Sequence, residues 1–267
     1  MPIEVLISFL LLGSFVGFMA GLLGIGGGGI MVPILTSIFL AQGVSIDNVV
    51  HLALGTSMAS IIVTSFSSMK AHNKNKNVLW GIVKLMSIGI LTGTFLATFI
   101  ASQISSIYLA LFFALFMGYV SIQMFLNKKP SPNRKLANKK GLFLVGNGIG
   151  AISALVSIGG GSLTVPYLTW SNIELKKAIG TSAAIGLPIS IAGTLGYIIN
   201  GWNNTAIENY TFGFVYLPAV LLISATSYFT APYGASFANK LPIGKLKKIF
   251  SLLLSILSIK MFITVVS

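Results

Sequence analysis

The sequence predicts an all-α polytopic membrane protein made of two repeats of inverted topology. Of its 267 residues, 55% are hydrophobic and 8% are charged, whereas a soluble domain carries about 25% charged residues. A membrane-spanning helix needs roughly 20 apolar residues. Longer uncharged stretches cover residues 5–46, 85–127, 141–173, 178–207 and 209–239. A glycine-rich motif that occurs once in each half of the chain divides the sequence into the two repeats.

The motif is a run of glycines followed by a short apolar segment that contains a proline. Its first copy covers Gly24 to Pro33, and its second copy covers Ser157 to Pro166. Glycine destabilises a helix by about 1 kcal/mol relative to alanine, so each run predicts the end of one helix and the start of another. Inside a membrane such a break is tolerated where protein or a water-filled cavity covers it. Two matching breaks therefore indicate the centre of a functional site.

In the first repeat, residues 1–127, the expected helices follow the apolar runs. A leg at 3–23 ends at the glycine run, and the leg that follows it at 30–41 is too short to cross a bilayer comfortably. This pair either re-enters on one side or crosses with one short span, and the sequence leaves both open. Three full transmembrane helices follow, at 51–70, 78–101 and 107–126.

The second repeat, residues 141–267, begins after a basic linker at 128–140 and has the same order. Legs at 141–156 and 162–170 flank the second glycine run. Three full spans are expected at 178–199, at 211–238 and from the Lys240–Lys248 cluster to the C-terminus. Two further matches support the repeat: Ala-x-Gly-Thr-Ser opens a span in each half, and Gln-Met-Phe at 123–125 has its counterpart in Lys-Met-Phe at 260–262.

The charges of equivalent loops predict that the repeats are inverted. The loop after the first Gly-Thr-Ser helix is basic, whereas its counterpart carries only Glu208. The next turn is uncharged at Ser102–Ser106 but strongly basic at Lys240–Lys248. Because Lys and Arg favour the cytoplasmic side, equivalent loops must lie on opposite sides, as in many secondary transporters. Every base except Lys260 then lies at or near the cytoplasmic face, and Lys260 either reaches the outer face or belongs to a substrate pathway.

The starts of the two short legs are the candidate binding site. A helix start presents unpaired N–H groups and about half a positive charge, which makes an anion site without any lysine. The hydroxyls of the Gly-Thr-Ser helices could complete the coordination of an oxyanion. The alternatives are that the glycines only allow close helix packing and that the hydroxyls bond their own helix. The substrate-binding candidates are Gly26, Gly27, Gly28, Gly29, Thr56, Ser57, Gly159, Gly160, Gly161, Ser162, Thr181 and Ser182.

The doubled glycine motif, the doubled Gly-Thr-Ser helix and His72 resemble the sulfite exporter TauE/SafE family of membrane permeases over nearly the whole chain. The resemblance implies a multi-pass protein of the bacterial inner membrane that moves sulfite, sulfonates or related organosulfur or carboxylate anions. We expect export, with leucine at Gly27 or Gly160 blocking transport in a folded protein. The second half departs from the first where Ser157 replaces Gly24 and where Tyr197 stands roughly at the place of His72.

Other classes of function fit the composition less well. The net charge of +13 comes from bases in short loops, so we expect a lipid bilayer and a small anion as partners, together with a homodimer as one arrangement, and no nucleic acid. We expect no cofactor, no metal and no enzyme, because the four carboxylates lie in loops or at helix ends. An integral-membrane enzyme and a structural membrane subunit remain the alternatives. His51 and His72 lie near predicted membrane boundaries, and we expect them to be solvated.

Overall fold

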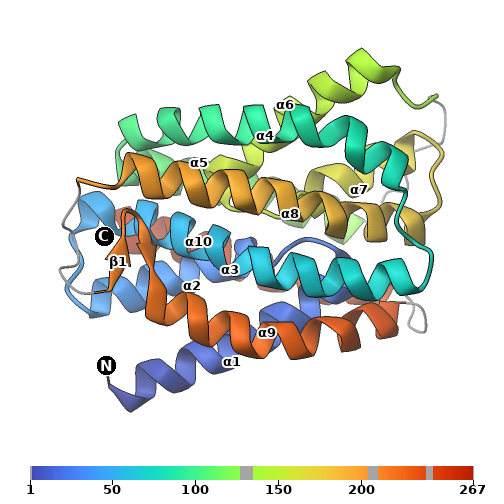
Figure 1. The fold of residues 1–267 in the computed structure, drawn as a ribbon. Helices are drawn as coiled ribbons and strands as arrows, with labels where there is room; N and C mark the ends of the chain where they lie inside the picture. Colours follow the sequence, from blue (N-terminus) through green and yellow to red (C-terminus); the bar gives the residue numbers. More distant parts are fainter. Residues whose placement is uncertain (1, 127–134, 204–209, 239–242, 267) are drawn as a thin grey trace.

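The computed structural model describes residues 2–126, 135–203, 210–238 and 243–266, with the backbone alone for 243–247 and 265–266. These residues form ten helices and one two-stranded hairpin, which confirms the all-α class (Figure 1). The elements are α1 (Ile3–Leu23), α2 (Gly28–Ala41), α3 (Ile46–Lys74), α4 (Trp80–Gln103), α5 (Ser106–Leu126), α6 (Lys139–Val156), α7 (Gly161–Trp170), α8 (Leu175–Asn200), β1 (Thr211–Phe212), β2 (Val215–Tyr216), α9 (Leu217–Ala238) and α10 (Ile243–Val266).

Several helices have the dimensions of membrane spans. Within the described ranges, α1, α3, α4, α5 and α8 are long and apolar enough to cross a membrane, so the chain is a multi-pass membrane protein. α2 and α7 have only 14 and 10 residues. In Figure 1 the pair α1–α2 begins and ends at the left of the molecule, whereas the pair α6–α7 begins and ends at the right. Each broken pair therefore returns to the end at which it starts.

Left-handed backbone conformations break both helix pairs. Gly24 ends α1 with φ 70°, and Gly27 precedes α2 with φ 87°. Ser157 ends α6 with φ 49°, and Gly160 precedes α7 with φ 82°. Glycine adopts this conformation freely, whereas the side chain of Ser157 adds a cost of about 1–2 kcal/mol. The short helices begin at Gly28 and Gly161, slightly before the starts that the sequence predicted.

Three other helix starts differ from the prediction. α3 begins at Ile46 instead of 51, because the Ser45 hydroxyl accepts a hydrogen bond from Asp47 N at 3.3 Å and caps the helix. α8 begins at Leu175, so its first turn includes part of the predicted loop. α9 begins at Leu217 instead of 211, because residues 211–216 form an antiparallel hairpin that turns at Gly213.

Small residues hold the crossing helices close together. Gly13 and Gly17 of α1 lie against the backbone of α9, and Gly146 and Gly150 of α6 lie against the backbone of α4. Glycines four positions apart allow such close approach of membrane helices. α6 stands in the second repeat where α1 stands in the first, and α4 corresponds to α9. The two contacts are therefore equivalent.

The contact between α5 and α10 is also reciprocal. Ser121 of α5 donates a hydrogen bond to Ser251 O, and Ser258 of α10 donates one to Ala114 O, each at 2.7 Å. Ser258 and Ser251 lie 137 positions after Ser121 and Ala114. A two-fold axis between the halves would produce this exchange. These contacts, and the opposite ends at which the broken pairs lie, support the inverted arrangement that the loop charges predict.

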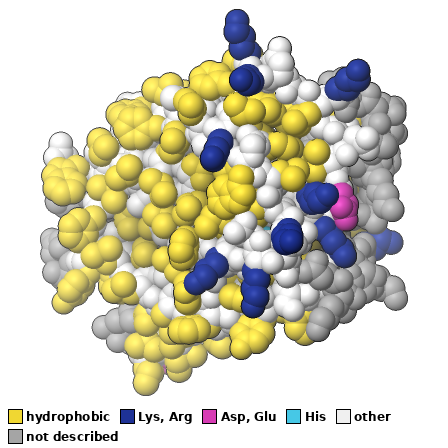
Figure 2. Space-filling view, turned by 45° about the vertical axis from the view of Figure 1, so that its right-hand side comes forward, with side chains coloured by type: hydrophobic (Ala, Val, Ile, Leu, Met, Phe, Trp, Pro, Cys, Tyr) yellow, Lys and Arg dark blue, Asp and Glu magenta, His cyan; other side chains and the backbone are white. Residues whose placement is uncertain are grey.

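Basic side chains gather at one end of the molecule. Lys74 lies at the end of α3, Lys140 at the start of α6 and Lys177 in the first turn of α8, and these three helix ends lie together at the right of Figure 1. Figure 2 shows a concentration of Lys side chains on that side. We call it the basic end, and by the positive-inside rule we expect it to face the cytoplasm. Linker residues 127–134, loop residues 204–209 and the side chains of 239–247 lie outside the description.

Candidate anion-binding site

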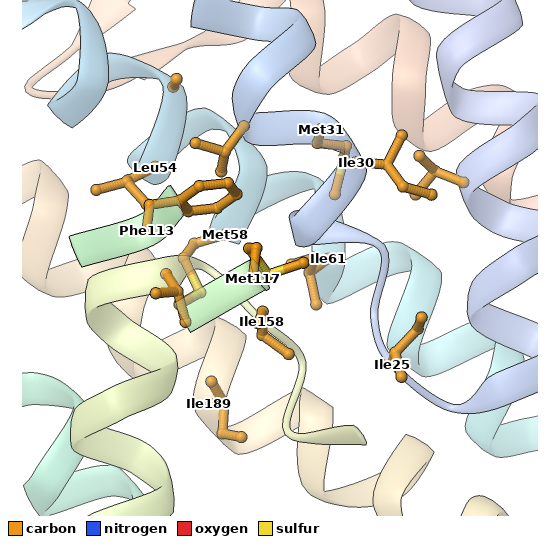
Figure 3. Close-up of a cluster of buried hydrophobic side chains, with 14 of the residues drawn as sticks. Ile25, Ile30, Met31, Leu54, Met58, Ile61, Phe113, Met117, Ile158 and Ile189 are labelled. Carbon is orange, nitrogen blue, oxygen red and sulfur yellow. The ribbon is translucent and has the colours of Figure 1, made fainter. Parts of the chain in front are cut away.

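The two glycine breaks touch each other through their backbones. Gly159 N donates a hydrogen bond to Ile25 O at 3.3 Å. A Cβ atom at Gly26 would lie 2.6 Å from Gly159 Cα, and one at Gly159 would lie 2.8 Å from Gly26 Cα, so no side chain fits at either position. The equivalent residues Gly26 and Gly159 thus form the contact between the repeats at the centre of the fold. Figure 3 shows Ile25 and Ile158 on the coil segments of the two breaks.

A cavity of about 210 Å³ lies at the start of α7. The N–H groups of Gly161 and Ser162 precede the first helical hydrogen bond, which Leu163 N donates to Gly160 O at 3.1 Å. No charged side chain lines the cavity in the described part of the chain. Its lining comes from the end of α1, from α5, from α7 and from α8: Leu23, Ile25, Tyr119, Val120, Gln123, Met124, Gly161, Ser162, Leu163, Val165, Pro166, Thr169 and Ile179.

The start of α2, in contrast, is covered by apolar side chains. Gly28 and Gly29 are buried. A Cβ atom at Gly29 would collide with Met117 Cε and lie 3.5 Å from Leu254 Cδ2, and one at Gly27 would collide with Val16. Figure 3 draws Met117 in the apolar cluster that also contains residues of α2. Of the two predicted helix-start sites, the one in the second repeat lines the cavity.

The threonines of the Gly-Thr-Ser helices hold backbone groups of the opposite repeat. Thr56 Oγ1 accepts a hydrogen bond from Tyr216 N, directly before α9, and Thr181 Oγ1 accepts one from Leu79 N, directly before α4. Both distances are 3.0 Å. Neither threonine lines the cavity. A role for them in anion binding stays a prediction.

The two serines of these helices differ from each other. Ser182 Oγ donates a hydrogen bond to Gly24 O at 2.8 Å. Ser57 Oγ is buried and has no hydrogen-bond partner among the described residues. Neither serine is part of the cavity lining. Ser182 binds Gly24, however, and the preceding residue Leu23 does line the cavity. Of the twelve predicted site residues, the structure places Gly161 and Ser162 in the cavity wall.

For leucine at Gly27 or Gly160, the geometry leads to another expectation than the sequence does. Both glycines have positive φ, and a Cβ atom at Gly160 would lie 2.9 Å from Ile189 Cδ1. A bulky residue at either place strains the backbone and collides with a neighbour. We therefore expect such variants to damage the fold, in which case they would not report on anion access.

The prediction of solvated histidines is wrong. His51 is 4% exposed and His72 is 1% exposed. The ring nitrogens of His51 lie 3.1 Å from Ser106 Oγ and 3.1 Å from Ala101 O. The boundary reasoning failed because α3 extends further in both directions than the predicted span, which brings both rings among the packed helices.

His72 and Tyr197 hold equivalent carbonyl groups. His72 Nε2 lies 2.9 Å from Gly21 O in the last turn of α1, and the Tyr197 hydroxyl donates to Ala154 O at 2.9 Å in the last turn of α6. Carbonyls at a helix end lack intrahelical partners, so each side chain satisfies one of them. The departure from His72 to Tyr197 therefore preserves this contact.

The sequence reasoning missed the contribution of α5 to the cavity. Tyr119, Val120, Gln123 and Met124 line it, and Gln123 and Tyr119 add polar groups to its lining. The signal was present, because an amide side chain is unusual in an otherwise apolar span. In the sequence analysis, Gln123 serves only as part of the match with Lys-Met-Phe at 260–262.

Comparison with known proteins identifies the family. The family model described as "Sulfite exporter TauE/SafE" matches residues 9–261. The chain is 38% identical over 255 residues to a "Probable membrane transporter protein" of Haemophilus influenzae, covering 95% of this chain and 97% of the relative. A probable membrane transporter protein of Methanocaldococcus jannaschii is 29% identical over 260 residues, covering 95% of this chain and 94% of the relative. One of Bacillus subtilis is 30% identical over 248 residues, covering 86% of this chain and 94% of the relative. No solved structure matches. The chain belongs to the sulfite exporter TauE/SafE family of membrane transporters.

Proposed function

We propose that this transporter moves small anions and holds them in the cavity at the start of α7. The observation that carries the proposal is the position of this cavity at the two backbone N–H groups that precede the first hydrogen bond of α7. A helix start carries about half a positive charge, and discontinuous membrane helices use such starts to bind anionic substrates. The Ser162 hydroxyl and the Gln123 amide supply further donors, and no carboxylate lines the described wall.

The size of the cavity favours a small substrate. Its volume of about 210 Å³ lies below the roughly 300–1,000 Å³ of pockets for drug-sized ligands. A cavity of this size is enough for a compact oxyanion with part of its hydration. Sulfite, a short sulfonate or a related organosulfur or carboxylate anion is the proposed substrate.

The membrane potential favours export through the two inverted repeats, with the anion entering at the basic end. Gln123 lies in the last turn of α5 and Thr169 at the end of α7, and both helices end near the basic end. Lys side chains there attract anions to the entrance. A membrane potential that is negative inside supplies about 2.3 kcal/mol per charge per 100 mV for an anion that leaves the cell, so export across the inner membrane needs no carboxylate relay.

The test is anion flux from proteoliposomes under a potassium potential set with valinomycin, at equal pH and equal sodium. Sulfite, ethanesulfonate and acetate serve as substrates. The variant Ser162→Leu fills the cavity and is expected to lower flux at least tenfold. Gly148→Leu is the matched control, because a side chain at Gly148 meets nothing within 4 Å. Wild-type flux in Ser162→Leu, or no potential-driven flux of any of these anions, contradicts the proposal.

A further inference from the structure

A hydrogen bond made by a serine of the Gly-Thr-Ser helices lacks the counterpart that neighbouring side-chain contacts have. His72 and Tyr197 bind equivalent carbonyls, and so do the serines that join α5 and α10. Ser182 Oγ of α8 donates to Gly24 O at 2.8 Å. Ser57 stands at the same place on α3, yet its hydroxyl has no partner in the described chain. The reciprocal pattern is broken at this bond.

The missing acceptor can be identified from the repeat. Gly24 corresponds to Ser157, so the counterpart of Gly24 O is Ser157 O. Ser157 lies beside α3, because its hydroxyl donates to Leu54 O at 3.2 Å, one helical turn before Ser57. The Ser157 carbonyl packs closely against the backbone of Gly28 at the start of α2. Donor and acceptor are therefore present in the same region without being bonded.

A buried hydroxyl without a partner requires an explanation. Ser57 and Ser182 are both 0% exposed, so neither is solvated at the surface. Leaving a buried hydroxyl unpaired is unfavourable, and native proteins pair most such groups. A second conformation in which Ser57 is bonded would account for the serine at this position.

The cavity is asymmetric at the same place. Ser182 and its acceptor Gly24 lie next to the cavity residues Leu23, Ile25 and Ile179. The equivalent region around Ser57 adjoins the start of α2, which Met117 and Leu254 close. The open cavity and the bonded serine thus belong to the same repeat, the second one.

We propose that this hydrogen bond changes sides during transport. The inference rests on the proposed function, because it requires access alternating between the two ends. In the conformation described above, Ser182 holds Gly24 O and the α7 start is open toward the basic end. In the opposite conformation, Ser57 holds Ser157 O, the Ser182 bond is broken, and the start of α2 opens toward the other end as Met117 and Leu254 separate from it.

Two matched cysteine reporters test this exchange in a chain that has no native cysteine. Val120→Cys lines the open cavity, and Leu257→Cys is the equivalent position on α10, 7% exposed in this conformation. Labelling rates with a small charged methanethiosulfonate are measured from the basic end for the first reporter and from the opposite end for the second. Ser182→Ala is expected to lower labelling at 120 and raise it at 257, so that the ratio of the two rates changes about fivefold, the effect of a hydrogen bond worth about 1 kcal/mol.

Ser57→Ala is expected to shift both rates in the opposite directions, and the double variant should return toward the rates of the parent. Ser60→Ala and Ser190→Ala are matched controls, because these buried hydroxyls bond carbonyls of their own helices. The proposed exchange is overturned if Ser57→Ala and Ser182→Ala shift the labelling rates in the same direction, or if neither variant shifts them. Protection of the 120 reporter by sulfite tests the proposed function separately, since it depends on anion binding and not on the direction of the shifts.

Discussion

The two glycine-broken segments have the same backbone design but different surroundings. α1–α2 and α6–α7 both break through left-handed residues and meet at Gly26 and Gly159. The start of α2 lies under Met117 and Leu254, whereas the start of α7 faces a cavity. The comparison teaches that the glycine motif positions a helix start, while the side chains of α5 and α10 decide whether a solute can reach it.

The strongest test of the comparison is the side of the membrane that each segment faces. Ser105 lies in the loop before α5 and Asn172 in the loop after α7, and both are exposed in the structure. Each is replaced in turn by a single cysteine. We expect Asn172→Cys to label with an impermeant maleimide only from the cytoplasmic side and Ser105→Cys only from outside. Labelling of both from one side would contradict the inverted repeats.

Leucine at the two capping glycines is expected to have the next largest effect. Gly27 and Gly160 have φ of 87° and 82°, where a side chain is strained in any surroundings. We expect most of both variants to be lost as folded, monodisperse protein in detergent chromatography. Gly81→Leu is the control, since nothing lies within 4 Å of its Cβ position. If one of the two variants folds normally, the breaks are not equivalent.

The serine at the start of α7 offers a smaller and more specific test. Ser162 corresponds to Gly29, so Ser162→Gly makes the second helix start resemble the first without filling the cavity. We expect sulfite binding, measured by calorimetry, to weaken about tenfold or more, because a hydrogen bond to a charged group contributes roughly 1.5–3 kcal/mol. An unchanged affinity would remove the Ser162 hydroxyl from the site.

The sequence predicted the features that depend on local pattern. Breaks at Gly24 and Ser157 follow from glycine content and the repeat, and the gathering of Lys74 and Lys177 at one end follows from the charges of loops. It did not predict the hairpin at 211–216, because its residues continue an apolar run that also suits a helix. It could not predict which helix start is open, because Met117 covers Gly29 of α2 through tertiary packing across 88 residues of chain.

The smallest expected effect concerns the charge at the mouth of the cavity. Gln123 of α5 corresponds to Lys260 of α10, so Gln123→Lys gives the open segment the base that the covered segment already has. An added positive charge beside the cavity attracts anions through water, and that attraction is screened over a Debye length of about 30 Å at 0.01 M ionic strength and about 3 Å at 1 M. We therefore expect the variant to take up sulfite at the basic end a few-fold faster at low ionic strength and at the wild-type rate at high ionic strength. Gln123→Leu is the control for loss of the amide, and it should lower the rate equally at both ionic strengths. A gain in Gln123→Lys that persists at 1 M salt would mean that the lysine binds the anion directly instead of attracting it through water.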